Sequence, residues 1–567
     1  MVGHAVIVGN NEQKERPSPE GHQPKTGEKA PNRLATDARE ANANEHNLTV
    51  RQALKAYPWA LFWTLACSMS IIMEGYDNIL ITSFFGFPTF KRQFGQYFPD
   101  RAGWEVPGPW QSALSSGPVA GSIIGAFLNG FIIHRHGFRF AFILGLVMMI
   151  GFIFVSFFGQ TVGVQTVGQF LCGQVVPWGM FATIGPAYAS EICPMAFRPY
   201  LTAYINVCFA IGQFISAGVI QSMVDRTDQW SYRIPFGLQW IWPAPLLCIA
   251  WFMPESPWWL VQNGQYEEAE RSVKRLMADF EKPKAAQVVA MIVRTNDIET
   301  EIQSGSSYLD CFRGTDRRRT EIACVVFAGQ ILCGAPLAFS ATYFFQQAGM
   351  STESSYKIGL GGTAIALLGT IASWLLIARF GRRTIYLVGM SFMSVFLLLI
   401  GLLALPSWKQ SIANTQSALC IVWLLTFSLS VGPIGWTVPA EVSSARLRAK
   451  TICLARNSYY ICQILANIIQ PYMLNPTEWN WHGKTGFFWF GFAALTYLWA
   501  FFRMVETKGT STFSLHENCP SLSNTFPDRT YQELDLAFAA KIPTRHFAAY
   551  NTSSSHKSPD RLHGHNA

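Results

Sequence analysis

The chain has 567 residues, of which half are hydrophobic and only 14% are charged. An ordinary soluble domain carries about a quarter charged residues, so this composition excludes that class and predicts a chain that sits largely in lipid. The net charge of +8 could suit a nucleic-acid partner, but Lys and Arg mostly flank apolar segments, as in the cytoplasmic loops of membrane proteins. We therefore expect the lipid bilayer, and no nucleic acid, as a partner.

Long stretches without Asp, Glu, Lys or Arg mark the membrane-spanning part of the chain. A helix needs about 20 apolar residues to cross the hydrocarbon core. Twelve largely apolar segments, most of them free of charged residues, are candidate spans at approximately 58–84, 111–133, 140–158, 166–190, 199–222, 235–253, 321–346, 357–378, 384–405, 416–440, 450–473 and 485–504. They predict an all-α membrane protein of twelve transmembrane helices, arranged as two six-helix halves at 58–253 and 321–504.

Polar segments surround these two halves. Residues 1–57 are polar for most of their length and rich in Asn, Glu, Lys and Pro, which is typical of a disordered tail. Residues 254–320 carry charges at helical spacing and predict a linker with short helices, and 505–567 form a second tail. Lys and Arg concentrate in the loops after the second, eighth and tenth spans, so both termini and the linker are expected in the cytosol.

Similar motifs close corresponding spans of the two halves. HRHGFR at 134–139 matches ARFGRR at 378–383, and SEICPMAFR at 190–198 matches AEVSSARLR at 440–448. Such recurrence is expected of parallel six-helix repeats. We expect the charged residues at these ends to form salt bridges between the halves that close a cytosolic gate. The gate candidates are Arg139, Glu191, Arg198, Glu255, Arg379, Arg382, Arg383, Glu441, Arg446 and Arg448.

These motifs, with PESP at 254–257 and ETKG at 506–509, resemble those of the sugar porters of the Major Facilitator Superfamily. Other segments resemble the fungal α-glucoside (maltose-type) proton symporters in particular. They are EGYD at 74–77, PAYASEICP at 186–194, YRIPFGLQWIWP at 232–243, PESPWWLV at 254–261, CGAPLAFSATYFF at 333–345 and PTEWNWHGKTGFFW at 476–489. The resemblance covers roughly 55–550 and implies a multi-pass plasma-membrane protein of this fold.

Ionisable residues deep inside the spans are few, and three of them are candidates for proton coupling. Glu74 and Asp77 are three residues apart and share one helix face. Two carboxylates so placed in a low dielectric cannot both ionise cheaply, which suits reversible proton binding. Arg456 on the eleventh span is the expected counter-charge from the opposite half, as the resemblance also implies. The alternative is a buried structural ion pair, although intramembrane charges are functional by default.

Sugar recognition needs amides or hydroxyls for the sugar hydroxyl groups and an aromatic ring for the apolar sugar face. Gln213, Gln330 and Trp436 match the sugar-porter pattern, and Tyr343, Asn457 and Tyr460 are further candidates. Polar residues in a span can instead hold helices together. No paired cysteine or histidine spacing typical of a metal site occurs, so we expect neither metal nor cofactor.

The leading hypothesis is a monomeric proton symporter that imports an α-glucoside disaccharide such as maltose by alternating access. One alternative is a facilitative transporter of hexose or another sugar. It is suggested by Ser122, at a position where close relatives often carry a glutamate. Another is a non-transporting sugar sensor with a transporter fold. No nucleophile elbow or phosphate-binding loop is present, so an enzyme is not expected.

The C-terminal tail contains a segment that interrupts the resemblance. In relatives the Glu-Thr-Lys motif runs almost directly into a stretch like RTYQELDLAF, which begins here only at Arg529. The intervening segment 510–528 is rich in Ser, Asn and Pro, which is typical of a loop. It is either a tolerated surface insertion or a translated, unspliced intron, and the mature transcript would distinguish the two.

Overall fold

The computed structural model of the protein describes residues 50–99, 103–171, 177–194, 198–303, 307–405, 410–444, 447–507 and Phe538. Most of the two predicted tails, the segment 510–528 and the gate candidate Arg446 lie outside the described residues. The described part is almost entirely helical, with one short two-stranded hairpin.

The first half consists of helices that are repeatedly bent or broken. Helix α2 (Val50–Ala56) precedes α3 (Pro58–Ser68) and α4 (Ser70–Phe84), which together occupy the predicted first span. Proline at the first turn begins several of these helices, because its fixed φ suits a position whose N–H has no intrahelical partner. The remaining elements are α5 (Pro88–Phe94), β1 (Gln96–Phe98), β2 (Gly103–Glu105), α6 (Gly108–Phe158), α7 (Val162–Phe170), α8 (Pro177–Ile192), α9 (Arg198–Met223), α10 (Trp230–Gly237), η3 (Leu238–Ile241) and α11 (Pro243–Trp251).

Helix α6 covers the predicted second and third spans without an intervening loop. Its helical geometry is interrupted at Gly137, which has φ 88° and ψ 173°. Glycine adopts a positive φ at no steric cost, so a single residue separates two helical segments here. The motif at 134–139, expected as a loop between two spans, is therefore mostly helical.

The linker and the second half continue the pattern. The linker contains α12 (Pro257–Gln262), α13 (Tyr266–Leu276), η4 (Lys282–Lys284), α14 (Ala285–Gln303) and η5 (Tyr308–Phe312). The second half contains α15 (Gly314–Leu332), α16 (Ala335–Phe339), α17 (Ala341–Gln347), α18 (Thr352–Arg379), α19 (Arg382–Leu403), α20 (Gln410–Leu429), α21 (Val431–Val442), α22 (Arg448–Leu474), η7 (His482–Lys484) and α23 (Thr485–Arg503).

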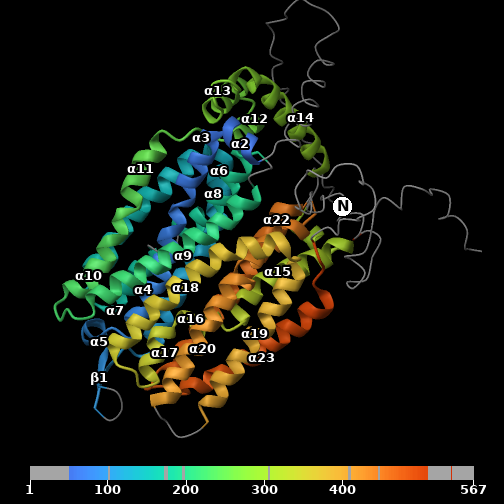
Figure 1. Ribbon diagram of the computed structural model, residues 1–567. Helices are drawn as coiled ribbons and strands as arrows, with labels where there is room; N and C mark the ends of the chain where they lie inside the picture. Colours follow the sequence, from blue (N-terminus) through green and yellow to red (C-terminus); the bar gives the residue numbers. More distant parts are fainter. Residues whose placement is uncertain are drawn as a thin grey trace, which may run out of the picture.

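The two halves meet along four long helices. Helix α22 packs against α6, and α18 packs against α9, so each contact joins the first half to the second. Within the halves, α4 packs on α9 and α15 on α22. Helices α12, α13 and α14 lie at one end of the bundle, and α5 with β1 lies at the opposite end (Figure 1). We call these the linker end and the hairpin end.

Seven helical segments of the described chain are long and apolar enough to cross a membrane. They are Leu128–Phe158, Tyr204–Met223, Trp230–Trp251, Thr352–Ile377, Arg382–Leu403, Ile412–Val442 and His482–Arg503. Of the other predicted spans, 58–84 is divided between α3 and α4, and 321–346 is divided among α15, α16 and α17, whereas 450–473 lies in the continuous helix α22. Backbone interruptions of this kind are tolerated at membrane depth where they are buried in protein or line a cavity.

Candidate functional site

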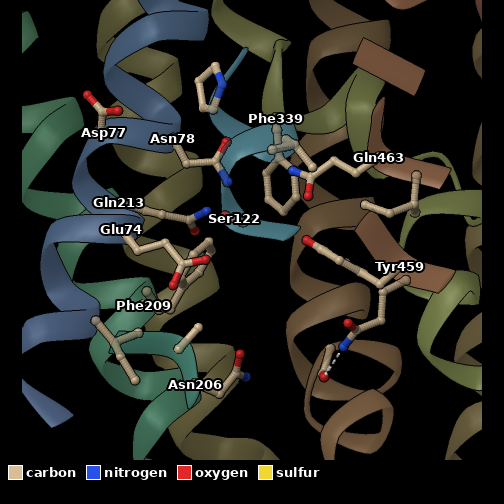
Figure 2. A pocket seen from close by; sticks show the side chains of 18 of the residues that line it. Glu74, Asp77, Asn78, Ser122, Asn206, Phe209, Gln213, Phe339, Tyr459 and Gln463 are labelled. Carbon is tan, nitrogen blue, oxygen red and sulfur yellow. Dashed lines mark hydrogen bonds between the residues drawn. The ribbon is translucent and has the colours of Figure 1, made fainter. Parts of the chain in front are cut away.

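A cavity lies between the two halves of the bundle. Its lining comes from α4, α6, α8 and α9 on one side and from α15, α16, α18, α20, α21 and α22 on the other. Figure 2 shows Glu74, Asn78 and Gln213 of the first half facing Tyr459 and Gln463 of the second. We call this space the central cavity.

A charged pair joins the halves across the central cavity. Glu74 on α4 and Arg456 on α22 approach to 3.6 Å between carboxylate oxygen and guanidinium nitrogen. Both side chains are mostly shielded from solvent, at 16% and 13% exposure. A charge in such a place is costly unless it is paired or hydrated. The contact therefore holds α4 and α22 together while both groups are ionised.

Aromatic rings surround the same arginine from its own half. The Arg456 guanidinium carbon lies 4.5 Å from the ring centre of Trp436, 4.7 Å from Tyr460 and 4.9 Å from Tyr459. A fourth ring, Phe327, lies at 5.5 Å. Cation–π attraction stabilises a cation over each ring by about 0.5–2 kcal/mol. The rings therefore continue to stabilise Arg456 when Glu74 is neutral.

Asp77 has a different partner from Glu74, although both lie on α4. Gln239 Nε2 donates a hydrogen bond to Asp77 Oδ1 at 2.6 Å, and both residues are buried. Gln239 lies in η3, the break in the span that α10 and α11 share. In Figure 2 the Asp77 carboxyl is turned away from Tyr459 and Gln463. The two carboxylates thus separate into one that faces the opposite half and one held within its own half.

Three residues proposed for sugar contact line the central cavity, and their side chains differ in whether other residues already contact them. Gln213 Nε2 is buried and has no hydrogen-bond partner among the described residues. Gln330 Nε2 donates to the carbonyl of Gly432 at 2.6 Å, so that donor is already used. Trp436 presents its ring to both the cavity and Arg456. Gln213 is therefore the amide best placed to donate to a ligand hydroxyl.

The remaining sugar candidates separate in space. Tyr460 of the second half and Ser122 of the first half both line the central cavity. Asn457 is absent from the cavity lining, and its amide approaches Cys453 Sγ at 3.8 Å on the same helix. Tyr343 lies nearer the hairpin end, where it contacts a buried carboxylate. Tyr460 therefore lies at the candidate site, and Tyr343 lies towards the hairpin end from it.

A buried ion pair of the first half contacts a tyrosine of the second half at the hairpin end. Glu105 is 1% exposed, and its carboxylate lies 2.7 Å from Lys91 Nζ. The Tyr343 hydroxyl, from the second half, donates to the other Glu105 oxygen at 2.7 Å. Gln111 Nε2 donates to the Val106 carbonyl and approaches the Tyr343 hydroxyl at 3.4 Å. We call Lys91, Glu105, Gln111 and Tyr343 the closure cluster.

Further hydrogen bonds between the halves support this closure. The Tyr356 hydroxyl donates to the Ser83 carbonyl at 2.6 Å, and Asn475 Nδ2 donates to the Val106 carbonyl at 2.9 Å. Asn467 Nδ2 donates to the Ser115 carbonyl at 2.7 Å. The structure therefore describes a conformation in which the hairpin end is shut above the central cavity.

At the linker end, each half contains a carboxylate that receives backbone N–H groups. Glu255 accepts from the N–H groups of Phe138 at 2.8 Å and Arg139 at 3.1 Å, directly after the Gly137 break. Burial raises the pKa of Glu255, while these hydrogen bonds favour its charged form. Glu506 accepts from the Arg382 N–H at 2.8 Å in the second half. We call these two arrangements the carboxylate cradles.

The other gate candidates lie around the cradles. Glu191 accepts a hydrogen bond from the Ser256 hydroxyl, and Glu441 accepts one from Thr507 and pairs with Arg382 at 3.1 Å. These contacts join parts of the same half, so salt bridges between the halves stay a prediction. Arg379 is exposed, Arg383 donates to the Phe501 carbonyl, Arg139 donates to the Trp251 carbonyl, and the side chains of Arg198 and Arg448 are not described.

Sequence reasoning missed Gln239 and Glu105. Gln239 lies in a segment noted only for its resemblance, YRIPFGLQWIWP, and an uncharged amide in a span gives little signal by itself. Glu105 lies in a loop of mixed charge. Among the described residues no group of three or more His, Cys, Asp or Glu side chains could hold a metal ion.

Solved structures of similar architecture show which fold the protein has. A major facilitator superfamily proton:xylose symporter, XylE bound to 6-bromo-6-deoxy-D-glucose, aligns with a TM-score of 0.64 at 19% identity, over 79% of this chain and 97% of that one. A partially occluded inward-open form of XylE from E. coli aligns with a TM-score of 0.63 at 18% identity, over 78% and 99%. The protein therefore has the fold of a major facilitator superfamily transporter, and the predicted fold class is confirmed.

Sequence comparison is more specific. The family model described as "Sugar (and other) transporter" matches residues 63–518. A general alpha-glucoside permease of Saccharomyces cerevisiae is 35% identical over 519 residues, covering 90% of this chain and 80% of the relative. Maltose permease MAL31 of the same yeast is 36% identical over 518 residues, covering 90% and 81%. The chain belongs to the sugar transporter family, which is a family of membrane transporters and not of enzymes.

Proposed function

We propose that the protein imports an α-glucoside disaccharide such as maltose across the plasma membrane by proton symport. The observation that carries the proposal is the Glu74–Arg456 pair, which joins the two halves inside a cavity lined by amides and aromatic rings. The names of the yeast relatives supply the substrate class. Under this proposal the linker end and both termini face the cytosol, and the hairpin end faces the medium.

Proton binding at Glu74 or Asp77 couples to the rocking of the halves. A proton on Glu74 removes the charge that attracts Arg456, and the aromatic rings around Arg456 keep the cation in place. The attraction between α4 and α22 then weakens, which lowers the barrier to separating the halves. Asp77 is the second proton site, positioned by Gln239. Each ligand shifts the equilibrium only by its difference in affinity for the two conformations.

Sugar binds between the two halves, in contact with α9 and α21. Gln213 donates to a hydroxyl from the first half, and Trp436 offers its ring from the second. Because the ligand then contacts both halves, its binding favours the conformation in which they close around it. The protein works as a monomer in this scheme, since both sides of the site come from one chain.

Uptake of labelled maltose, sucrose and glucose into cells without their own transporters tests the proposal. We expect accumulation of the α-glucosides, faster at acidic external pH and abolished by a protonophore. Uptake that merely equilibrates and ignores both treatments would identify a facilitative transporter. Binding without uptake would identify a sensor, and uptake of glucose alone would refute the substrate class.

A further inference from the structure

A second pocket adjoins the central cavity on the side of the hairpin end. Its lining includes Gln111 and Tyr343 of the closure cluster, and it shares Asn78 and Gln463 with the central cavity. Figure 2 shows Asn78 and Gln463 on opposite sides of the space near Phe339. We call this space the hairpin-end pocket.

Two buried amides in the hairpin-end pocket have atoms without a hydrogen-bond partner among the described residues. These atoms are Gln111 Oε1 on α6 and Gln470 Nε2 on α22. Each amide is fixed through its other atom, because Gln111 Nε2 donates to Val106 and Gln470 Oε1 accepts from Trp489 Nε1 at 2.7 Å. Burying an amide atom without a partner is costly. An acceptor from one half and a donor from the other therefore indicate a polar occupant.

Polar residues lead from the central cavity into this pocket along both halves. On α22, Gln463, Asn467 and Gln470 follow at spacings of four and three residues, which places them on one helix face. On α4, Asn78 and Thr82 are four residues apart and also share one helix face. A ligand that begins beside Gln213 and extends towards the hairpin end therefore meets amides and hydroxyls along its length.

The size of the pocket limits what can enter it. It encloses about 40 Å³, whereas the central cavity encloses about 130 Å³. Since one water needs about 10–15 Å³ measured this way, the pocket holds only about three waters. This volume suits the hydroxyl edge of a ring whose remainder lies in the central cavity, and it does not suit a complete second ligand.

We propose that the hairpin-end pocket is the subsite that recognises the second glucosyl ring of an α-glucoside disaccharide. Gln111 Oε1 accepts a hydrogen bond from one of its hydroxyls, and Gln470 Nε2 donates one to another. The central cavity, with Gln213 and Trp436, holds the first ring. The inference rests on the proposed function, because that proposal supplies the α-glucoside class.

Equilibrium binding to the purified full chain tests the inference with maltose and with methyl α-D-glucopyranoside, which keeps one α-linked ring and lacks the second. Gln470→Leu removes the free donor, and Ser340→Leu narrows the pocket. Both residues line the hairpin-end pocket and not the central cavity. Each change should weaken maltose binding about tenfold and methyl glucoside binding less than twofold. Gln213→Ala, in the central cavity, is the matched control and should weaken both ligands alike.

Retained methyl glucoside binding shows that each variant is folded. If the wild-type chain binds both ligands but the two variants weaken them equally, or weaken neither, the second-ring subsite is refuted and the proposed function stands. If the wild-type chain binds neither ligand, the α-glucoside class itself is wrong and the subsite is refuted with it.

Discussion

Replacing Tyr343 by Phe should open the hairpin end while keeping the buried ring in place. The lost hydroxyl donates to the Glu105 carboxylate at 2.7 Å and joins the two halves. A hydrogen bond to a charged group contributes about 1.5–3 kcal/mol. Because 1.4 kcal/mol corresponds to a tenfold change in an equilibrium constant, losing a bond made only in the closed form favours the open form by about 10- to 150-fold.

Tyr356→Phe is a matched control for this substitution. Tyr356 is also buried and also joins the halves, but its hydroxyl donates to the neutral carbonyl of Ser83. Such a bond contributes about 0.5–1.5 kcal/mol, so its loss should favour opening only about two- to tenfold. In a Glu105→Gln background, where the acceptor is neutral, Tyr343→Phe should favour the open form no more than Tyr356→Phe does.

Labelling of a cysteine inside the closed space measures the opening. Ser115 lines both the central cavity and the hairpin-end pocket, and Ser115→Cys places a thiol there. A membrane-impermeant maleimide added to intact cells should label it at least about tenfold faster with Tyr343→Phe. The chain without Ser115→Cys gives the background from native cysteines. Equal labelling rates in the Tyr343→Phe and Tyr356→Phe variants would refute the reasoning.

Four other changes test separate parts of the structure. Asp77→Asn should abolish proton-driven accumulation of sugar while the protein still reaches the membrane; full accumulation would remove Asp77 from the mechanism. Gln239→Leu removes the donor 2.6 Å from Asp77 and should lower the maximal rate of proton-coupled uptake about tenfold. The half-saturation constant should change little, and an altered pH profile of uptake would distinguish this effect from a general loss of protein. Gly381→Ala would place a Cβ 2.1 Å from Glu506 Oε2, so the carboxylate would have to move and would lose its hydrogen bond from the Arg382 N–H. The melting temperature of the purified protein should then fall by an amount equivalent to about 1–3 kcal/mol; an unchanged melting temperature would show that this cradle does not stabilise the fold. Deleting 510–527 should leave uptake unchanged, because the segment lies outside every predicted span and candidate site, and a loss of uptake at normal protein abundance would disprove this.

The fold was largely predictable because lipid imposes simple rules on composition. Charge-free stretches of about 20 residues indicate helices whatever their partners are. The divisions within the spans were not predictable in the same way. Nothing in the local pattern distinguishes a continuous span from α3 followed by α4, or shows that Gly137 alone separates two helices. These breaks depend on packing against distant segments.

The candidate site was predictable where charge alone marks a residue. Glu74, Asp77 and Arg456 are conspicuous because ionised groups are rare in lipid, and their role in coupling stays a prediction. Gln239 could not be singled out, since an amide in a span is common and its value depends on Asp77 lying 2.6 Å away. Glu105 is ordinary in its loop and becomes notable only through burial against Tyr343, far along the chain.

The carboxylate cradles have a consequence for how the chain could be divided. Each half has a glutamate directly after its last helix, Glu255 in the first half and Glu506 in the second. Each glutamate accepts one or more hydrogen bonds from backbone N–H groups that follow an earlier helical segment of the same half. Both cradles are complete without any atom of α14, which connects the halves through the linker. If the gene were divided within α14, each of the two encoded polypeptides would therefore keep its own carboxylate cradle. In this sense the transporter is a covalent dimer of related subunits.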